Sequence, residues 1–137
     1  GPGQLPMYIV PQVLTQIKEN HQVEIRNGSV MRDLLFVEDC IDAVLKLSVT
    51  PSAENSEFNI GSGHIVSISD VAKAAVQASG FDDVEITDLE EFIAFSPTAI
   101  MANIDKVQAT IDWFPKTTLK DGLRRMWDAM GNGKVTG

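Results

Sequence analysis

Arg32 is the residue whose side chain and sequence surroundings best suit it to bind a ligand. It stands immediately before Asp33 and before an apolar run at 34–37, which predicts a short buried strand. Such a strand would hold the arginine rigidly, and the planar guanidinium suits a phosphate or a carboxylate. The alternative is a surface ion pair of Arg32 with Asp33 or Asp39, and from the residues alone that arrangement is the commoner one.

Three other groups of residues have side chains capable of chemistry, and each has a simpler explanation. Cys40 stands in an apolar helical setting and is expected in the core rather than as a nucleophile. His21 and His64 stand alone, without the Cys/His spacing of a metal site. Gly61-Ser62-Gly63 could cradle a phosphate, but it lacks the Gly-x-Gly-x-x-Gly pattern, so a tight turn between a strand and a helix is the better interpretation.

The elements that must position these residues are short strands and helices, which predicts an α/β domain. Asp39 is expected to cap one helix and Ser69 the next, and Gly80 should end that second helix. Asn27-Gly28 predicts a hairpin between the strand at 21–26 and the arginine strand. The expected helices are 8–18, 39–49, 70–79, 106–111 and 118–130, and the expected strands are 21–26, 34–37, 57–60, 65–66 and 84–87.

Length and composition limit the classes of protein to which this chain can belong. A chain of 137 residues with 44% apolar content suits one domain with a modest core, expected at 1–130 with a frayed tail at 131–137. The net charge of −8 argues against nucleic acid as a partner, because nonspecific binding needs a basic field. No apolar run reaches membrane-spanning length, and the single cysteine cannot form an internal disulfide, so we expect a cytoplasmic protein.

Four motifs occur in order along the chain, and together they suggest a family. They are Gly1-Pro2-Gly3-Gln4, Arg32-Asp33-Leu34, Phe58-Asn59-Ile60-Gly61-Ser62-Gly63, and the run Pro115-Lys116-Thr117-Thr118-Leu119-Lys120-Asp121-Gly122-Leu123. In this order the chain resembles, over almost its whole length, the C-terminal part of the NAD(P)-dependent nucleotide-sugar epimerases and dehydratases. These enzymes are extended short-chain dehydrogenase/reductases. The resemblance implies a small mixed sheet with flanking helices, without the Rossmann domain.

The resemblance also implies a binding site for a nucleoside-diphosphate sugar. Arg32 would bind the diphosphate. The predicted hairpin would hold the base through backbone groups, including those of Ile25, and Arg26 stands where the family often has an aromatic residue. Asn103, the fourth predicted site residue, stands where the family often has a second phosphate-binding arginine. The base, the sugar and the reaction are not identified by these residues.

The chemistry of the family depends on parts that this sequence lacks. The family uses NAD(P) with a glycine-rich fingerprint and a Tyr-x-x-x-Lys pair, whereas the only tyrosine here is Tyr8 and position 12 is glutamine. The resemblance implies that the tyrosine pair would lie shortly before Gly1. We therefore expect no cofactor in this chain and no activity of the chain alone, although NAD(P) is implied for a full-length relative.

The same comparison predicts a partner. In the resembled family the strand at 58–60 joins the sheet of the cofactor domain, so here it would be left with an unpaired edge. We expect this edge to meet a cofactor-binding domain or a second copy of the chain. The alternative function is a stand-alone, non-enzymatic module for ligand binding or oligomerisation, derived from the same fold.

Overall fold

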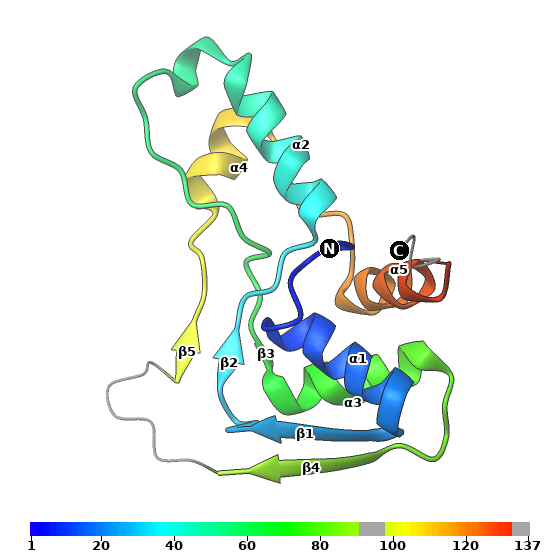
Figure 1. The fold of residues 1–137 in the computed structure, drawn as a ribbon. Helices are drawn as coiled ribbons and strands as arrows, with labels where there is room; N and C mark the ends of the chain where they lie inside the picture. The colour runs from blue at the N-terminus through cyan, green and yellow to red at the C-terminus, as the bar shows by residue number, and fades with distance from the viewer. Residues whose placement is uncertain (91–97, 133–137) are drawn as a thin grey trace.

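The computed structural model describes residues 1–90 and 98–132, and it confirms the α/β class (Figure 1). Helix α5 continues to Asn132, so the first two residues of the expected tail are helical, and 133–137 lie outside the described residues. In chain order the elements are α1 (Ile9–Asn20), β1 (Gln22–Arg26), β2 (Met31–Arg32), α2 (Val37–Ser48), a 3-10 turn η1 (Pro51–Ala53), β3 (Val66–Ser67), α3 (Ile68–Ser79), β4 (Glu85–Leu89), β5 (Ala99–Ile100), α4 (Asp105–Ile111) and α5 (Leu119–Asn132).

The described strands form two small sheets rather than one. Strand β2 is the middle strand of a mixed sheet of order β3–β2–β5, antiparallel to β3 and parallel to β5. Strands β1 and β4 pair in parallel, in a register that runs from Gln22 opposite Glu85 to Arg26 opposite Leu89. Because a parallel pair needs a long crossover, the chain makes β2, α2, β3 and α3 before it returns to β1.

The predicted hairpin at Asn27-Gly28 is wrong, although the turn itself is present. Asn27 has a positive φ of 54°, and Val30 N–H donates to the Asn27 carbonyl at 2.9 Å. The turn leads into the other sheet, because β1 pairs with β4 and not with β2. Gly28 N–H donates to Asp88 Oδ1 at 2.9 Å, and a Cβ at position 28 would lie 2.1 Å from Asp88 Oδ2. A side chain at position 28 would therefore displace the Asp88 carboxylate from this hydrogen bond.

The main core lies between α1, α3, α5 and strand β1 (Figure 1). Small buried residues of α3, among them Ala72, Ala75 and Ala78, let the neighbouring helices approach closely. A second, smaller cluster joins α2 to α4 around Ala43 and Trp113. Helix α5 packs one face against the main core, through Leu119, Leu123, Met126, Trp127 and Met130.

Helix α2 begins two residues earlier than predicted. Its first residue is Val37 and its N-cap is Phe36, so Asp39 lies inside the first turn instead of capping the helix. Asp39 is buried, and its Oδ2 accepts a hydrogen bond from Thr117 N–H at 2.9 Å. The expected strand at 34–37 is also wrong, since β2 ends at Arg32. The Asp39 carboxylate, which the sequence suggested as the cap of α2, instead accepts a hydrogen bond from the segment that precedes α5.

Two further caps differ from the prediction by one or two residues. Ser67, not Ser69, caps α3, and its Oγ accepts a hydrogen bond from Asp70 N–H at 3.0 Å. Helix α4 begins at Asp105 with Ile104 as its N-cap, one residue before the expected start of the helix at 106. Gly80 ends α3 in the left-handed conformation, with φ of 78°, as expected.

Residues 57–60 form no strand in the described structure, contrary to the prediction. Their burial nevertheless alternates as in a strand, with Glu57 and Asn59 exposed and Phe58 and Ile60 half-buried. Phe58 and Ile60 pack against the cluster between α2 and α4. The alternation of exposed and half-buried side chains is that of a strand, but this segment has no sheet neighbour within the described chain.

Candidate ligand-binding site

Arg32 ends β2, and strands flank it on both sides. It lies opposite Val66 of β3 and Ile100 of β5. The N–H of the next residue, Asp33, donates to the Ile100 carbonyl at 3.1 Å. The Arg32 side chain is half-buried, and its Nη1 donates to the Met31 carbonyl at 2.8 Å. The backbone that carries the guanidinium is therefore held from both sides, because a middle strand has ladder partners on each edge.

The carboxylate of Asp33 joins three segments of the chain. Its Oδ1 accepts hydrogen bonds from Ser62 N–H at 2.7 Å and from Ser62 Oγ at 2.6 Å. Its Oδ2 accepts from Gly63 N–H at 3.1 Å and from Ala102 N–H at 3.2 Å. We call Asp33, Gly61, Ser62, Gly63 and Ala102 the Asp33 junction. The end of β2, the glycine turn and the segment after β5 all meet there.

These contacts change the acidity of Asp33. Burial raises the pKa of this carboxyl, but the hydroxyl and N–H of Ser62 and the N–H groups of Ala102 and Gly63 lower it, and the net pKa lies below the ordinary value. The side chain is therefore ionised at neutral pH. Asp33 and Asp39, the two acids suggested as surface partners of Arg32, both accept hydrogen bonds from backbone N–H groups.

Ile25 and Arg26 occupy the end of β1, directly before the turn that leads to β2. The Ile25 side chain is 1% exposed within the main core, so only its backbone groups are placed to meet a ligand. Arg26 is exposed, and its Nη2 lies 3.6 Å from Glu24 Oε1. The structure thus places Arg26 at the end of β1, from which the turn leads to β2, and gives the Ile25 side chain a packing role.

Asn103 lies on the segment that follows β5, the strand that pairs with β2. It comes three residues after Ile100, which is opposite Arg32, and it is exposed. Its Oδ1 accepts a hydrogen bond from Asp105 N–H at 3.0 Å, which stabilises the first turn of α4. The Asn103 amide nitrogen remains able to donate to a ligand, so the local structural role and the predicted binding role are compatible.

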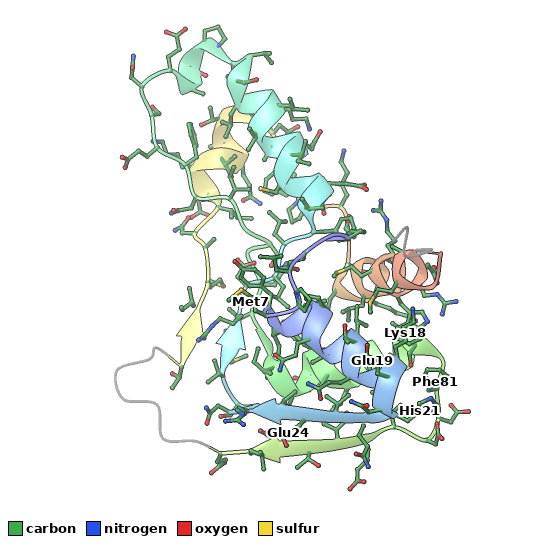
Figure 2. All side chains as sticks on the ribbon, viewed as in Figure 1. Met7, Lys18, Glu19, His21, Glu24 and Phe81 are labelled. Atoms are coloured by element: carbon green, nitrogen blue, oxygen red, sulfur yellow. The ribbon has the colours of Figure 1, made fainter. Side chains whose placement is uncertain are left out.

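The histidines have local structural contacts, as expected. His21 follows α1 in the left-handed conformation, and its ring lies 4.4 Å from the Phe81 ring, centroid to centroid (Figure 2). Its Nδ1 is 3.3 Å from Asp83 Oδ1. His64 is exposed beside the glycine turn. Cys40 differs from the prediction, since it is half-buried at the wall of a cavity rather than inside the core.

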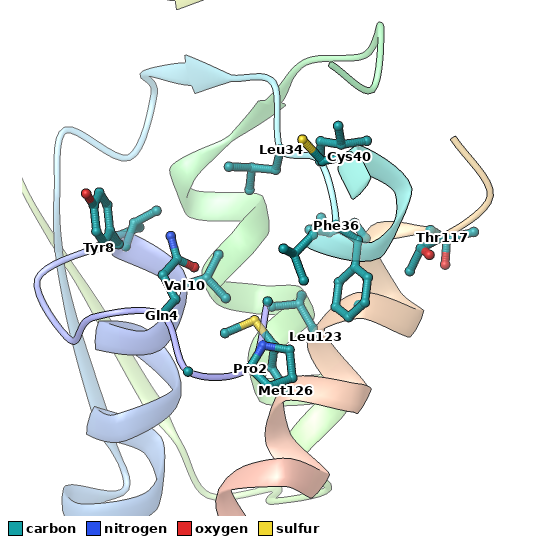
Figure 3. A pocket seen from close by; sticks show the side chains of 18 of the residues that line it. Pro2, Gln4, Tyr8, Val10, Leu34, Phe36, Cys40, Thr117, Leu123 and Met126 are labelled. Atoms are coloured by element: carbon teal, nitrogen blue, oxygen red, sulfur yellow. The ribbon is translucent and has the colours of Figure 1, made fainter. Parts of the chain in front are cut away.

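The larger cavity has a volume of about 650 Å³ and lies beside the predicted ligand residues rather than around them. Its walls come from the first residues of the chain, the segment between β2 and α2, and the start of α5 (Figure 3). The labelled side chains there are mainly apolar, including Val10, Leu34, Phe36 and Met126. A smaller cavity of about 360 Å³ is bordered by Ser62 of the Asp33 junction. Neither lining includes Arg32 or Asn103.

The glycine turn does not fit the phosphates of a dinucleotide cofactor. The N–H groups of Ser62 and Gly63, which would cradle a phosphate, already donate to the Asp33 carboxylate. The Asp33 carboxylate thus occupies the place that a phosphate would take in such a turn, and its charge would repel one. A Cβ at Gly61 would also lie only 2.6 Å from Asp33 Oδ2. The interpretation of this motif as a tight structural turn is supported by these contacts.

Two further kinds of site are absent from the described part of the chain. Residues 1–90 and 98–132 contain no group of three or more His, Cys, Asp or Glu side chains arranged to hold a metal ion. In the same residues, no helix is long and apolar enough to cross a membrane.

Sequence reasoning missed the Asp33 junction. Both halves of it were visible as motifs, the Arg-Asp pair and the Gly-Ser-Gly cluster, but the hydrogen bonds link residues 29, 30 and 69 positions apart in sequence. The sequence feature that indicates the junction is Asp33, which directly follows Arg32 and which the sequence alone suggested only as an ion-pair partner. A carboxylate can accept up to about four hydrogen bonds, so Asp33 is able to bind backbone N–H groups from two distant segments at once.

The fold and these motif-bearing segments define part of an extended short-chain dehydrogenase/reductase. A family model described as GDP-mannose 4,6 dehydratase matches residues 2–126. The chain belongs to this family. The resemblance to nucleotide-sugar epimerases and dehydratases inferred from the four motifs is confirmed.

Comparison with individual proteins agrees with this family and shows how much of it is present. GDP-L-fucose synthase of Sinorhizobium fredii is 28% identical over 131 residues, which cover 89% of this chain and 40% of that protein. UDP-glucuronic acid 4-epimerase from Bacillus cereus, solved in complex with UDP-glucuronic acid and NAD, is 25% identical, with a TM-score of 0.83 and coverage of 96% and 42%. RMD from Pseudomonas aeruginosa, complexed with NADPH, shares the fold at 21% identity, with a TM-score of 0.83 and coverage of 94% and 44%. The chain thus spans about two fifths of the length of these relatives.

Proposed function

We propose that this chain is the nucleoside-diphosphate-sugar-binding part of an NAD(P)-dependent epimerase or dehydratase, in which Arg32 binds the diphosphate. The observation that carries the proposal is the position of Arg32 at the end of a middle strand, with Asn103 on the neighbouring segment and Arg26 at the adjacent corner. Membership of the family supports it, as does the relative that was solved with UDP-glucuronic acid and NAD.

Each of these residues has a defined role in the proposal. The Arg32 guanidinium donates two parallel N–H bonds to diphosphate oxygens, a geometry that an ammonium group does not reproduce. Asn103 donates from its amide nitrogen, without the charge that an arginine would bring. Arg26 covers the base, and the backbone groups near Ile25 contact its edge. The chain's own part in the chemistry is to bind and orient the substrate.

In this proposal the nicotinamide cofactor is held by a cofactor-binding domain, which is the partner of this chain. The apolar cavity of about 650 Å³ and the unpaired segment at 57–60 both suit contact with another folded unit. A second candidate function is a non-enzymatic oligomerisation module. The observation that favours it is the apolar face of α2, where five large side chains are exposed.

The proposal is tested by calorimetric titration of the 137-residue chain with ADP, CDP, GDP, UDP and dTDP. We expect one or more of them to bind, and we expect Arg32→Ala to weaken that binding by roughly tenfold or more. The reason is that a charge-assisted bidentate contact contributes about 1.5–3 kcal/mol, and each 1.4 kcal/mol corresponds to about a tenfold change in Kd. Arg32→Lys should retain only part of the affinity, since it keeps the charge and loses the fork.

Arg124→Ala is the matched control, because it removes the same charge from α5, where Nε lies 3.3 Å from Asp128 Oδ1. Its affinity should equal that of the wild-type chain. If none of the five nucleotides binds, or if Arg32→Ala binds as well as the wild type, Arg32 is not a diphosphate ligand.

A further inference from the structure

Asp33 has little capacity left to bind a ligand itself, and its contacts suggest a different role. Each of its oxygens accepts two hydrogen bonds, from Ser62 at Oδ1 and from Gly63 and Ala102 at Oδ2. A carboxylate can accept about four, so this one is close to saturated. Three of the four donors are backbone N–H groups, and therefore the carboxylate fixes the paths of two other segments relative to β2.

The Asp33 junction is also tightly packed. A Cβ added at Gly61 would lie 2.5 Å from the Ala102 Cβ and 2.6 Å from Asp33 Oδ2. Gly61 itself is buried. The end of β2, the glycine turn and the segment after β5 therefore have almost no freedom to shift against one another.

The joined segments are the ones that carry the proposed diphosphate ligands. Arg32 immediately precedes Asp33, and Asn103 immediately follows Ala102, whose N–H the carboxylate binds. We propose that Asp33 is a positioning residue of the ligand site, which sets the spacing between Arg32 and Asn103 through its bond to Ala102. The inference rests on the proposed function, since it assigns Asp33 a role in that same site.

Asp33→Asn is the direct test, because it keeps the size of the side chain and removes one acceptor oxygen. In either orientation its NH₂ group must face backbone N–H donors, either that of Ser62 or those of Gly63 and Ala102. We expect the affinity for the best-binding nucleotide of the five to fall about tenfold, because a displaced Arg32 would lose about one charge-assisted hydrogen bond to the diphosphate. Ser62→Ala removes only the hydroxyl, so this variant should fold more readily than Asp33→Asn and should show a smaller loss of nucleotide affinity.

Asp39→Asn is the matched control. Asp39 is another buried carboxylate that accepts a backbone hydrogen bond, from Thr117, but it belongs to α2 and not to the segments of the ligand site. It should lower the thermal unfolding temperature while leaving nucleotide affinity unchanged. Equal loss of affinity in Asp33→Asn and Asp39→Asn would show general destabilisation and overturn the inference.

A double-mutant cycle separates positioning from simple stabilisation. If Asp33 acts through Arg32, then Asp33→Asn should have much less effect on affinity in an Arg32→Ala background than in the wild type. Additive losses would overturn the inference. Failure of the wild-type chain to bind any of the five nucleotides would remove the proposed function, whereas wild-type binding that Asp33→Asn and Ser62→Ala leave intact would remove only the role of Asp33.

Discussion

Helix α2 exposes a continuous apolar face, and we predict that the isolated chain associates with itself through it. Val37, Ile41, Leu45 and Val49 are spaced four residues apart and form one row, with Val44 beside it. Their exposed fractions are 41%, 50%, 62% and 80%, and that of Val44 is 51%. Self-association was also predicted from the segment at 57–60, but the structure offers α2 as the larger apolar surface.

The expected strength follows from these exposures. Fully burying one aliphatic side chain contributes about 1.5–3 kcal/mol, and roughly half of each of the five is still exposed, so pairing of two faces would recover on the order of 10 kcal/mol. Association itself costs an estimated 4–15 kcal/mol. If the cost lies at the lower end of that range, about 4–6 kcal/mol, the remaining gain of about 4–6 kcal/mol predicts a weak dimer with a Kd between about 40 μM and 1 mM.

The row is self-complementary when two copies meet in antiparallel orientation. Val37 then faces Val49 of the other copy, and Ile41 faces Leu45. Rows with a spacing of four residues interdigitate at a crossing angle of about −50°. The net charge of −8 opposes the approach of two copies, but salt screens this repulsion beyond about 8 Å.

The assay is sedimentation velocity of the 137-residue chain over a wide concentration range at physiological salt. We expect the wild type to show a concentration-dependent shift toward dimer and Ile41→Glu/Leu45→Glu to remain monomeric. Met101→Glu is the control, since Met101 is 56% exposed on a different part of the surface. The reasoning is refuted if the wild type is a monomer throughout, or if the double variant and the control dimerise equally.

Two further predictions follow. The pKa of Asp33 is lowered on folding, so its contribution to stability is present above the ordinary aspartate pKa of about 3.9 and is lost as pH falls through the lower folded value. Denaturant unfolding at several pH values should therefore show the wild type more stable than Asp33→Asn at pH 7, with the gap narrowing below about pH 4, and a gap independent of pH would contradict this. The chain alone should turn over no nucleotide sugar when NAD or NADP is added, since it lacks the Tyr-x-x-x-Lys pair; measured epimerase, dehydratase or reductase activity would disprove that expectation.

Much of the fold was predictable because local chemistry determines it. The apolar spacing of α1, α3 and α5 predicted three helices close to their observed bounds, and Gly80 predicted the end of α3. Errors arose where two local signals competed. Ser67 and Ser69 can each cap a helix, and Asp39 meets the rules for an N-cap, but a distant N–H at Thr117 provided a better partner for a buried carboxylate.

The candidate site was predictable in its residues and not in its arrangement. Arg32, Arg26 and Asn103 were named from their motifs, and the structure places the first and the last on neighbouring segments. Ile25 was named as well, but its side chain belongs to the core. The parallel pairing of β2 with β5 joins positions 68 residues apart, and no local pattern encodes that register.

The sequence by itself determined the helices, the turn residues and the identity of the charged groups, because these depend on side-chain spacing and backbone preference over a few positions. Only the tertiary structure decided what those groups do. The Asn27-Gly28 turn leads into a second sheet, because β1 pairs with β4 over five residues, whereas β2 is only two residues long. The tertiary structure also placed the Asp33 carboxylate on the glycine turn, because the half-buried N–H groups of Ser62, Gly63 and Ala102 needed an acceptor that only the folded chain brings within reach.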